Sequence, residues 1–248
     1  MKVIAFVQAR MSSSRLPGKV LKKIIEKPML DHLISRLSYS KLIDEVVVVT
    51  SDDDSDDAIE NLCCELKIKF FRGSLDNVLE RFYLASKAYS ADHIVRITGD
   101  CPLLDSEIVD YIISEHLKSN CNYTSNTINP SYPDGQDVEV FDVATLEKMY
   151  IQAESKIDQE HVTFYCYTHP DLFKLNNIKN PRGDFSTYRW TVDNDVDFLF
   201  VEKIYEELYQ NNKEFNSLDI YKLLDKKPYL SEINKGIVRN EGLKTSLE

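Results

Sequence analysis

The chain has 248 residues, of which 43% are hydrophobic and 29% are charged, and its net charge is −11. These values are typical of one globular domain with a sizeable core, and the small numbers of Gly and Pro exclude fibrous and low-complexity chains. The acidic balance excludes an extended nucleic-acid surface, and no apolar stretch approaches the roughly 20 residues that a membrane span needs. An apolar segment begins almost at the first residue and leaves no room for a signal peptide, so we expect a cytoplasmic protein.

In the first half of the sequence, short apolar segments alternate with amphipathic ones. The apolar segments are nearly continuous, as in the four valines at 46–49, which is typical of strands buried on both faces of a parallel sheet. The repeated strand–helix–strand order predicts that helices cover both faces of that sheet. We expect strands at 3–7, 45–50, 67–71 and 93–97, and helices at 29–37, 56–66, 76–89 and 106–117.

The second half of the sequence is less regular, with short strands, a turn-rich segment and more helices. We expect an α/β fold with a mostly parallel central sheet and a small β-hairpin and helical subregion in this half. We expect one domain over 1–248, made of halves 1–120 and 121–225 and a tail at 226–248 packed over them. The expected elements are strands at 121–127, 138–141 and 187–192, a turn at 130–135, and helices at 144–153, 159–167, 196–208 and 218–224.

The loop after the first strand carries the most informative pattern. Residues 8–19 contain two arginines, a lysine and three serines, and the first 40 residues carry eight Lys and Arg in an otherwise acidic chain. The planar guanidinium groups of Arg10 and Arg15, the compact charge of Lys19 and hydroxyls such as that of Ser13 suit a polyphosphate ligand. A solvated basic loop is the simpler alternative, and the G-x-x-x-x-G-K-[ST] motif is absent.

Two carboxylates follow predicted strands at the points where the strands end. Asp100 follows the strand at 93–97, and Asp193 follows the strand at 187–192. Ligands of parallel sheets bind at the carboxyl ends of the strands, and Mg²⁺ prefers carboxylates together with substrate phosphates. We therefore expect Asp100 and Asp193 to hold one magnesium ion. Helix capping is the alternative, and it is the better account of Asp105, which opens the next predicted helix.

Two segments of the second half are candidates for binding a second substrate. The turn at 133–135 is followed by an alternating pattern that places Asp137 and Glu139 on one face. Gln136, Asp137 and Glu139 could form a wall that reads the substrate, or they could belong to a hairpin with a solvated acidic face. His161 could contact the same substrate, although a lone helical histidine is more often structural.

The two remaining loops at the predicted strand ends are less specific. The acidic run at 51–57 follows the second strand, and 72–77 follows the third. Helix capping explains part of the acidic run. Contact with a nucleotide could explain Asp52, and Gly73 could border a base.

Together these segments resemble the cytidylyltransferases that activate sugar acids, such as acylneuraminate and 3-deoxy-manno-octulosonate cytidylyltransferases. The SpsF-like branch, which serves spore coat polysaccharide biosynthesis, resembles the chain most. The resemblance follows the same order along nearly the whole chain. The segments that carry it include Gln8-Ala9-Arg10-Met11, Arg15-Leu16-Pro17-Gly18-Lys19, Phe71-Arg72-Gly73-Ser74, Arg96-Ile97-Thr98-Gly99-Asp100, Pro133-Asp134-Gly135, Glu160-His161-Val162-Thr163, Trp190-Thr191-Val192-Asp193 and Arg239-Asn240-Glu241-Gly242.

The resemblance implies a three-layer nucleotide-diphosphosugar-transferase fold. It also implies Mg²⁺-dependent transfer of CMP from CTP to a sugar acid or a phosphorylated acceptor, with release of pyrophosphate. Arg10, Lys19 and Asp100 would be catalytic, Asp193 would complete the metal site with Asp100, and a homodimer would form through 128–185. The expected nucleotide-binding residues are Ala9, Arg10, Ser13, Arg15, Lys19, Asp52, Gly73 and Asp100.

Two other functions remain open at the level of sequence. A nucleotide-sugar-dependent glycosyltransferase would use a D-x-D pair, and Asp193-Asn194-Asp195 satisfies that pattern, although the basic loop suits a triphosphate better. A non-catalytic nucleotide-binding partner would bind CTP without turnover. The chain also departs from the sugar-acid enzymes at Cys101, where they often carry an acidic residue, which weakens any second carboxylate next to Asp100.

Overall fold

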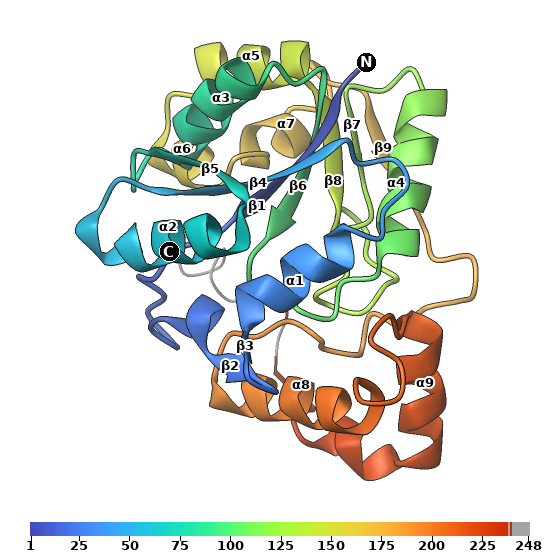
Figure 1. Ribbon diagram of the computed structural model, residues 1–248. Helices are drawn as coiled ribbons and strands as arrows, with labels where there is room; N and C mark the ends of the chain where they lie inside the picture. The colour runs from blue at the N-terminus through green and yellow to red at the C-terminus, as the bar shows by residue number, and fades with distance from the viewer. Residues whose placement is uncertain (238, 240–248) are drawn as a thin grey trace.

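A mostly parallel, seven-stranded sheet forms the centre of the protein in a computed structural model that describes residues 1–237 and 239 (Figure 1). Its strands are β1 (Val3–Gln8), β4 (Glu45–Ser51), β5 (Lys69–Gly73), β6 (His93–Thr98), β7 (Tyr123–Ser125), β8 (Glu139–Asp142) and β9 (Leu175–Asn177). Their order across the sheet is β5-β4-β1-β6-β8-β7-β9, and β8 runs antiparallel to both of its neighbours. The expected α/β fold class is confirmed. The antiparallel β7–β8 pair is the hairpin expected in the second half, built into the main sheet.

Helices cover both faces of the sheet, as Figure 1 shows. The helices are α1 (Met29–Leu37), α2 (Asp57–Leu66), α3 (Val78–Tyr89), α4 (Ser106–Lys118), α5 (Val143–Gln152), α6 (Lys156–Glu160), α7 (Phe164–Thr168), α8 (Asp195–Leu208) and α9 (Ser217–Lys226), with 3₁₀ helices at Lys19–Leu21, Asp54–Asp56 and Pro228–Glu232. Side chains of α1, α2 and α4 share a core with α8 and α9, and α3, α5 and α7 contribute to the core on the opposite face. None of the described helices combines the length and apolarity that a membrane span requires.

The continuous apolar sequence of β1 is explained by its position between these two cores. Val3, Ala5 and Val7 pack into the core beneath α1, α2 and α4, whereas Ile4 and Phe6 pack into the core beneath α3 and α5. Successive side chains of a strand point to opposite faces, so a strand covered on both faces must be apolar at every position.

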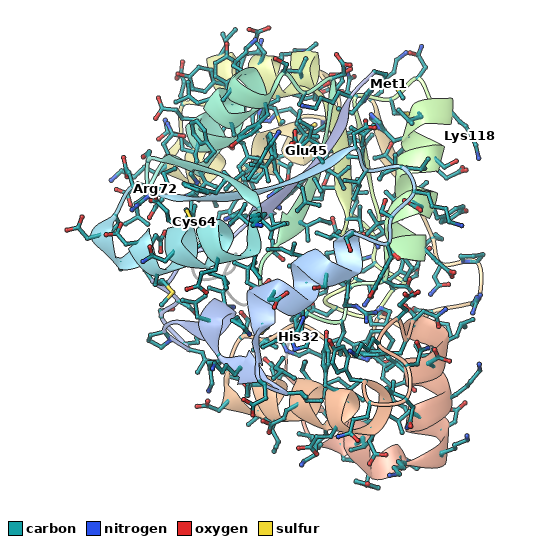
Figure 2. All side chains as sticks on the ribbon, viewed as in Figure 1. Met1, His32, Glu45, Cys64, Arg72 and Lys118 are labelled. Carbon is teal, nitrogen blue, oxygen red and sulfur yellow. The ribbon has the colours of Figure 1, made fainter. Side chains whose placement is uncertain are left out.

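A short hairpin, β2 (Lys23–Ile24) and β3 (Lys27–Pro28), precedes α1 and was not expected. Its two turn residues, Ile25 and Glu26, have positive φ angles of 43° and 67°. Neither residue is one of the Gly, Asn or Asp residues that usually signal such a turn. His32 of α1, labelled in Figure 2, is bonded to the carbonyl of Ile24 at 2.7 Å. It also packs against Tyr205 of α8 and Tyr209 at the end of that helix, so the hairpin is joined to both helices.

The predicted single helix at 159–167 is wrong. The structure has α6 and α7 there, with a break at 161–163. Val162 is fully buried in the core, and the Thr163 hydroxyl donates to Glu139 at 2.5 Å. The break thus lies where one residue enters the core and the next bonds to β8.

The predicted strand at 187–192 is also wrong. This segment makes one isolated bridge, between Arg189 and Asp134, and no ladder. Its backbone pairs with loops instead, since Trp190 N donates to Asp134 O at 2.6 Å and Val192 N donates to Asp100 O at 2.9 Å. Strand β9 was not expected.

Gly135 allows the loop before β8 to lie directly against this extended segment. Its φ is +99°, and a Cβ atom at this position would stand 2.5 Å from the backbone nitrogen of Thr191. Only glycine tolerates both conditions. The tail expected at 226–248 is described through 237 and at 239, so the Asn240-Glu241-Gly242 part of the resemblance lies outside the described residues.

Candidate active site

The basic loop at 8–19 is hydrogen-bonded to the connection between β4 and α2 and folds back on itself. Met11 N donates to Oδ1 of the buried Asp56 at 2.7 Å, and Gly18 N donates to Met11 O at 2.9 Å. Gly18 has a φ of +68°, which reverses the chain. As a result Lys19 is turned inward and only 7% exposed.

Lys19 joins the two carboxylates that were expected to share a metal ion. Its Nζ donates to Asp100 Oδ2 at 2.8 Å, to Asp193 Oδ1 at 3.0 Å and to Val192 O at 2.7 Å. The three segments lie far apart in the sequence, so this convergence is a result of the fold. Burial disfavours the charge on Lys19, but Asp100 and Asp193 outweigh it and raise the pKa of the lysine.

Asp193 is surrounded by cations. Besides Lys19, it accepts from Arg15 at 2.7 Å and from Arg189 at 2.7 Å. Burial disfavours ionisation of Asp193, but Lys19 and Arg15 hold its pKa far below the usual range. Burial likewise disfavours ionisation of Asp100, and Lys19 lowers its pKa in spite of the neighbouring Asp193. Both groups are therefore carboxylates at neutral pH, the form that binds a cation.

Two cavities meet at these carboxylates. The loop cavity, of about 240 Å³, lies against the basic loop, and the large cavity, of about 410 Å³, lies against β6 and β8. Groups bound in the two cavities would therefore face each other across the carboxylates. The residues that line both cavities are Arg15, Thr98, Asp100 and Asp193.

Most of the expected nucleotide-binding residues line the loop cavity. Those that do so are Ala9, Arg10, Ser13, Arg15, Lys19 and Asp100. Asp52 and Gly73 line neither cavity. They lie at the carboxyl ends of β4 and β5, where Asp52 N donates to Gly73 O at 2.8 Å.

Three of the four expected substrate residues line the large cavity, namely Asp137, Glu139 and His161. The interpretation of Gln136 as a substrate-reading residue is wrong. Its side chain is fully buried, with Nε2 donating to Leu103 O at 2.6 Å and Oε1 accepting from Asp105 N at 2.9 Å. Gln136 thus joins two loops, and its buried side chain lines neither cavity. Asp105 caps α4 as expected, accepting from Glu107 N at 2.9 Å.

Glu139 belongs to a bonded network that sequence analysis did not anticipate. It forms an ion pair with Arg96 and accepts from Tyr123 Oη and Thr163 Oγ1, both at 2.5 Å. Arg96 also donates to the side chain of Gln8, at 3.0 Å from Nη2. The network spans β1, β6 and β8 and fixes one wall of the large cavity. Arg96 lies within the Arg96-Ile97-Thr98-Gly99-Asp100 motif. This motif was the signal in the sequence that could have pointed to Arg96 as a site residue.

A second group of charges closes the other side of the large cavity. Asp134 accepts from Arg189 at 2.6 Å, and Asp137 pairs with Arg239, whose Nη1 donates to Tyr132 O at 3.3 Å. Burial and the neighbouring Asp137 raise the pKa of Asp134 to about 7, against the opposing effect of Arg239 and Arg189. Asp134 and Arg189 were not among the expected site residues, although Asp134 stands in a motif that carried the resemblance and Arg189 directly precedes another.

The D-x-D pattern at 193–195 does not form one site. The side chain of Asp195 is 80% exposed and pairs with Lys22 at 2.9 Å, while Asn194 caps α8 by accepting from the backbone nitrogens of Val196 and Asp197. Asp193 alone faces the cavities. The described residues contain no cluster of three or more His, Cys, Asp or Glu placed to hold a metal, so Asp100 and Asp193 would need oxygen ligands from a substrate.

The family of this chain follows from its match to a family model. The cytidylyltransferase model matches residues 4–235. The chain belongs to the cytidylyltransferase family. Members of this family are nucleotidyltransferases, so the chain is an enzyme of that class, and the expected family is confirmed.

Individual relatives agree with this assignment. The chain is 41% identical over 243 residues to a Methanocaldococcus jannaschii protein of uncharacterised function, with 96% of each chain covered. It is 32% identical over 231 residues to the spore coat polysaccharide biosynthesis protein SpsF of Bacillus subtilis, covering 91% of this chain and 95% of SpsF. It is 32% identical over 114 residues to the 3-deoxy-manno-octulosonate cytidylyltransferase of Geobacter metallireducens, covering 46% and 44%.

The fold is also found in a solved structure. A cytidylyltransferase from Leptospira borgpetersenii superposes with a TM-score of 0.90 at 32% identity, covering 96% of this chain and 100% of the other. Nearly the whole chain therefore shares its fold with a solved cytidylyltransferase.

Proposed function

We propose that this protein transfers CMP from CTP to a sugar acid or a phosphorylated sugar, with Mg²⁺ and with release of pyrophosphate, in polysaccharide biosynthesis. The observation that carries the proposal is the bridge from Lys19 to Asp100 and Asp193 at the junction of the two cavities. This junction is where a triphosphate in the loop cavity and an acceptor in the large cavity would react.

The donor set suits a magnesium ion. Asp100 and Asp193 are ionised, and an oxygen of each lies within 3.0 Å of the same lysine nitrogen, so the two can approach one ion. Mg²⁺ usually takes one or two protein carboxylates and completes its shell with water and phosphate oxygens. When bound, the ion would neutralise charge on the α-phosphate and orient it.

The residues of the loop cavity would bind and orient the triphosphate. Arg10, Arg15 and Lys19 line the cavity and supply three positive charges. With CTP bound, Lys19 and Arg15 would exchange carboxylate oxygens for phosphate oxygens and stabilise the negative charge that develops on the departing pyrophosphate. The cations would therefore act most strongly in the transition state.

The reaction itself is a single displacement at phosphorus. An acceptor oxygen forms a bond to the α-phosphorus, the bond from that phosphorus to the oxygen bridging to the β-phosphate breaks, and pyrophosphate leaves with the electron pair. No covalent enzyme intermediate is needed, and the buried Cys101 is unsuited to form one because burial raises its pKa well above the usual value. A phosphate acceptor needs no base, and a hydroxyl acceptor must lose its proton.

The acceptor class is supported by the named relatives and by the walls of the large cavity. One relative acts on a sugar acid, and another serves spore coat polysaccharide synthesis. The cavity presents arginines, carboxylates and His161, a mixture that suits a polyhydroxylated sugar carrying an anionic group. We further propose that residues 1–248 act as one domain in the cytoplasm, as a homodimer joined through 128–185.

The test is a thermal-shift screen of the four nucleoside triphosphates with Mg²⁺, followed by pyrophosphate release with CTP and a panel of sugar acids and sugar phosphates. Saturation at 100 Kd adds about 2.7 kcal/mol to stability, which raises the melting temperature of a domain this size by about 5–10 °C. We expect CTP to give this shift and one acceptor to release pyrophosphate. Absence of any shift by CTP would contradict the proposal, and a CTP shift without turnover on any acceptor would favour a non-catalytic binding protein.

A further inference from the structure

Arg81, in the first turns of α3, is a buried arginine whose donors are unused. Its side chain is fully buried, and its three nitrogens have no hydrogen-bond partner among the described residues. Other buried arginines are bonded, since Arg36 donates to Leu104 O and Phe215 O, and Arg189 donates to three aspartates. Buried donors without acceptors are costly, so the unused donors of Arg81 call for an acceptor from a ligand.

Nearby carboxylates offset part of the cost of burying the charge of Arg81, but none of them accepts a hydrogen bond from it. The nearby Asp56 supports the charged form of the arginine, but its own oxygens are taken by Met11 N, Thr50 Oγ1, Ser51 N and Ser51 Oγ. Burial lowers the pKa of Arg81 to about 10 in spite of Asp56, so the group stays charged at neutral pH. Its donors therefore remain available to an acceptor from a ligand, and carbonyl oxygens and ring nitrogens of a base are acceptors of this kind.

Arg81 lies on the side of the loop cavity that is opposite to the large cavity. A Cβ atom on Gly73, at the end of β5, would stand 3.2 Å from Arg81 Cγ, and Arg10 of the basic loop is close enough to repel the guanidinium. In the sheet order, β5 and β4 lie on one side of β1 and its loop, while β6 and β8 lie on the other. A nucleoside extending away from the acceptor would reach this region.

We propose that Arg81 donates to O2 and N3 of the cytosine ring and thereby selects CTP over UTP. The inference rests on the proposed function, since it assumes that CTP is bound. Cytosine presents two adjacent acceptors to the arginine fork, whereas uracil carries an N–H at N3 between its two carbonyl groups. With uracil, one N–H of the guanidinium would face the N3–H donor and stay unpaired, which is the kind of mismatch that separates close analogues.

The neighbouring Arg72 is not available for this role. Its Nε donates to Ser51 O at 2.9 Å, its Nη2 donates to Asp53 O at 2.9 Å, and its Nη1 bonds two carboxylates of α2. Figure 2 shows Arg72 at the edge of the sheet beside α2. Arg81 itself is covered, so a base reaches it only when a neighbouring side chain moves. Arg10, which is exposed and repels Arg81, would be drawn away from it by the triphosphate.

The experiment measures the Kd values of CTP and UTP with Mg²⁺ by calorimetry, together with the melting temperature of the nucleotide-free protein, for wild type, Arg81→Met, Arg81→Lys and Arg36→Met. We expect wild type to prefer CTP by about tenfold to a hundredfold, as one bidentate contact provides. In Arg81→Met the preference falls to within about threefold because that contact is lost. Arg81→Lys keeps the charge without the planar fork and loses the preference too.

Stability separates a ligand-binding arginine from a structural one. Arg81→Met removes a buried cation that has no hydrogen bond of its own, and Asp56 keeps its four protein donors, so the melting temperature should fall less than in Arg36→Met. Arg36→Met is the matched control, because it removes a bonded buried arginine and should lower the melting temperature while leaving the CTP preference intact. An unchanged preference in Arg81→Met, or a melting temperature that falls as in Arg36→Met, would overturn the inference alone.

Two further outcomes concern the ligand. Tighter binding of GTP than of CTP to wild type, lost in Arg81→Met, would overturn the cytosine assignment, since guanine also offers two adjacent acceptors at O6 and N7. No binding of any triphosphate to wild type would overturn the proposed function and the inference with it.

Discussion

The loop cavity and the large cavity differ in how their charged side chains are bonded. In the loop cavity Arg10 is exposed, and Lys19 is bonded to carboxylates that are themselves the expected metal ligands. In the large cavity Arg96 and Glu139 are bonded to each other and to neighbouring strands. The first arrangement can exchange its partners for phosphate oxygens and a metal ion, and the second is a fixed wall.

Because of this difference, we expect the two cavities to have different roles. Burial and like charge would separate Asp100 from Asp193, and the lysine offsets that repulsion while no ligand is bound. The wall formed by Arg96 and Glu139 does not depend on a ligand in this way, because these two groups already pair with each other. Changes in the loop cavity should therefore affect binding and rate, and changes in the wall should affect stability.

The largest expected effect comes from Lys19→Ala. The substitution removes the cation that would stabilise the departing pyrophosphate, and loss of one preorganised group of this kind typically costs about 10²–10³ in rate. We expect turnover with CTP to fall by that factor and the thermal shift with CTP to shrink. Initial rates of pyrophosphate release, together with circular dichroism to confirm folding, measure both effects.

A matched control lies three residues away. Lys22 is more exposed and pairs with the exposed Asp195 at 2.9 Å, so Lys22→Ala removes an equal charge from the same segment and should leave the rate nearly unchanged. Equal losses in the two variants would mean that the overall positive field matters and the position of Lys19 does not. The distinction between exchangeable and fixed charges would then fail.

The parallel half of the fold could be predicted because burial on both faces leaves a plain signal. The valines at 46–49 form β4, and the apolar run at 3–7 forms β1, because every side chain there enters one of two cores. The second half gave weaker signals. At the break between α6 and α7, Val162 and Thr163 contact residues far away in the sequence, and no local pattern encodes such contacts.

In the candidate site, too, some residues could be predicted from local sequence and others could not. Asp100 and Asp193 could be located because both follow apolar segments whose ends meet in the fold. Gln136 was misassigned because a buried amide that bonds to two backbone groups has the same local sequence as one that faces a substrate. Arg81 could not be identified at all, since its distinguishing feature is the absence of hydrogen bonds among the described residues.

Glu139→Gln tests the fixed wall. The amide keeps the shape of Glu139 but leaves Arg96 without its counter-charge and presents an NH₂ group to donors. Breaking a buried ion pair in this way costs about 3–5 kcal/mol, which lowers the melting temperature of a domain this size by about 10 °C. We expect the additional shift produced by CTP to remain as in wild type, because the loop cavity keeps its cations.

The control for this variant is Glu147→Gln, at an exposed pair with Lys87. Exposed pairs contribute about 0–1 kcal/mol, so the melting temperature should hardly change. If Glu139→Gln instead kept its stability and lost the CTP shift, the wall and the loop cavity would be one coupled unit.

The smallest expected effect concerns the pH dependence of stability in the part of the fold whose contacts are fixed. His116 of α4 is bonded to Thr124 of β7 at 3.0 Å, beside the strand that carries Glu139, and burial lowers its pKa to about 4. The unfolded chain takes up this proton near pH 6.5 and the folded chain does not. Its contribution is therefore intact above pH 6.5 and is lost as the pH falls toward 4.

Urea unfolding of wild type and His116→Gln at pH 7 and pH 5 measures this contribution. Wild type should lose about 2 kcal/mol more than the variant between the two pH values, because only wild type carries a histidine at this position to titrate. Equal losses would mean that the folded protein takes up the proton at His116 as readily as the unfolded chain does. A larger loss in wild type would show that His116 stays neutral in its buried contact with Thr124, so that the packing of α4 on β7 does not open to take up the proton.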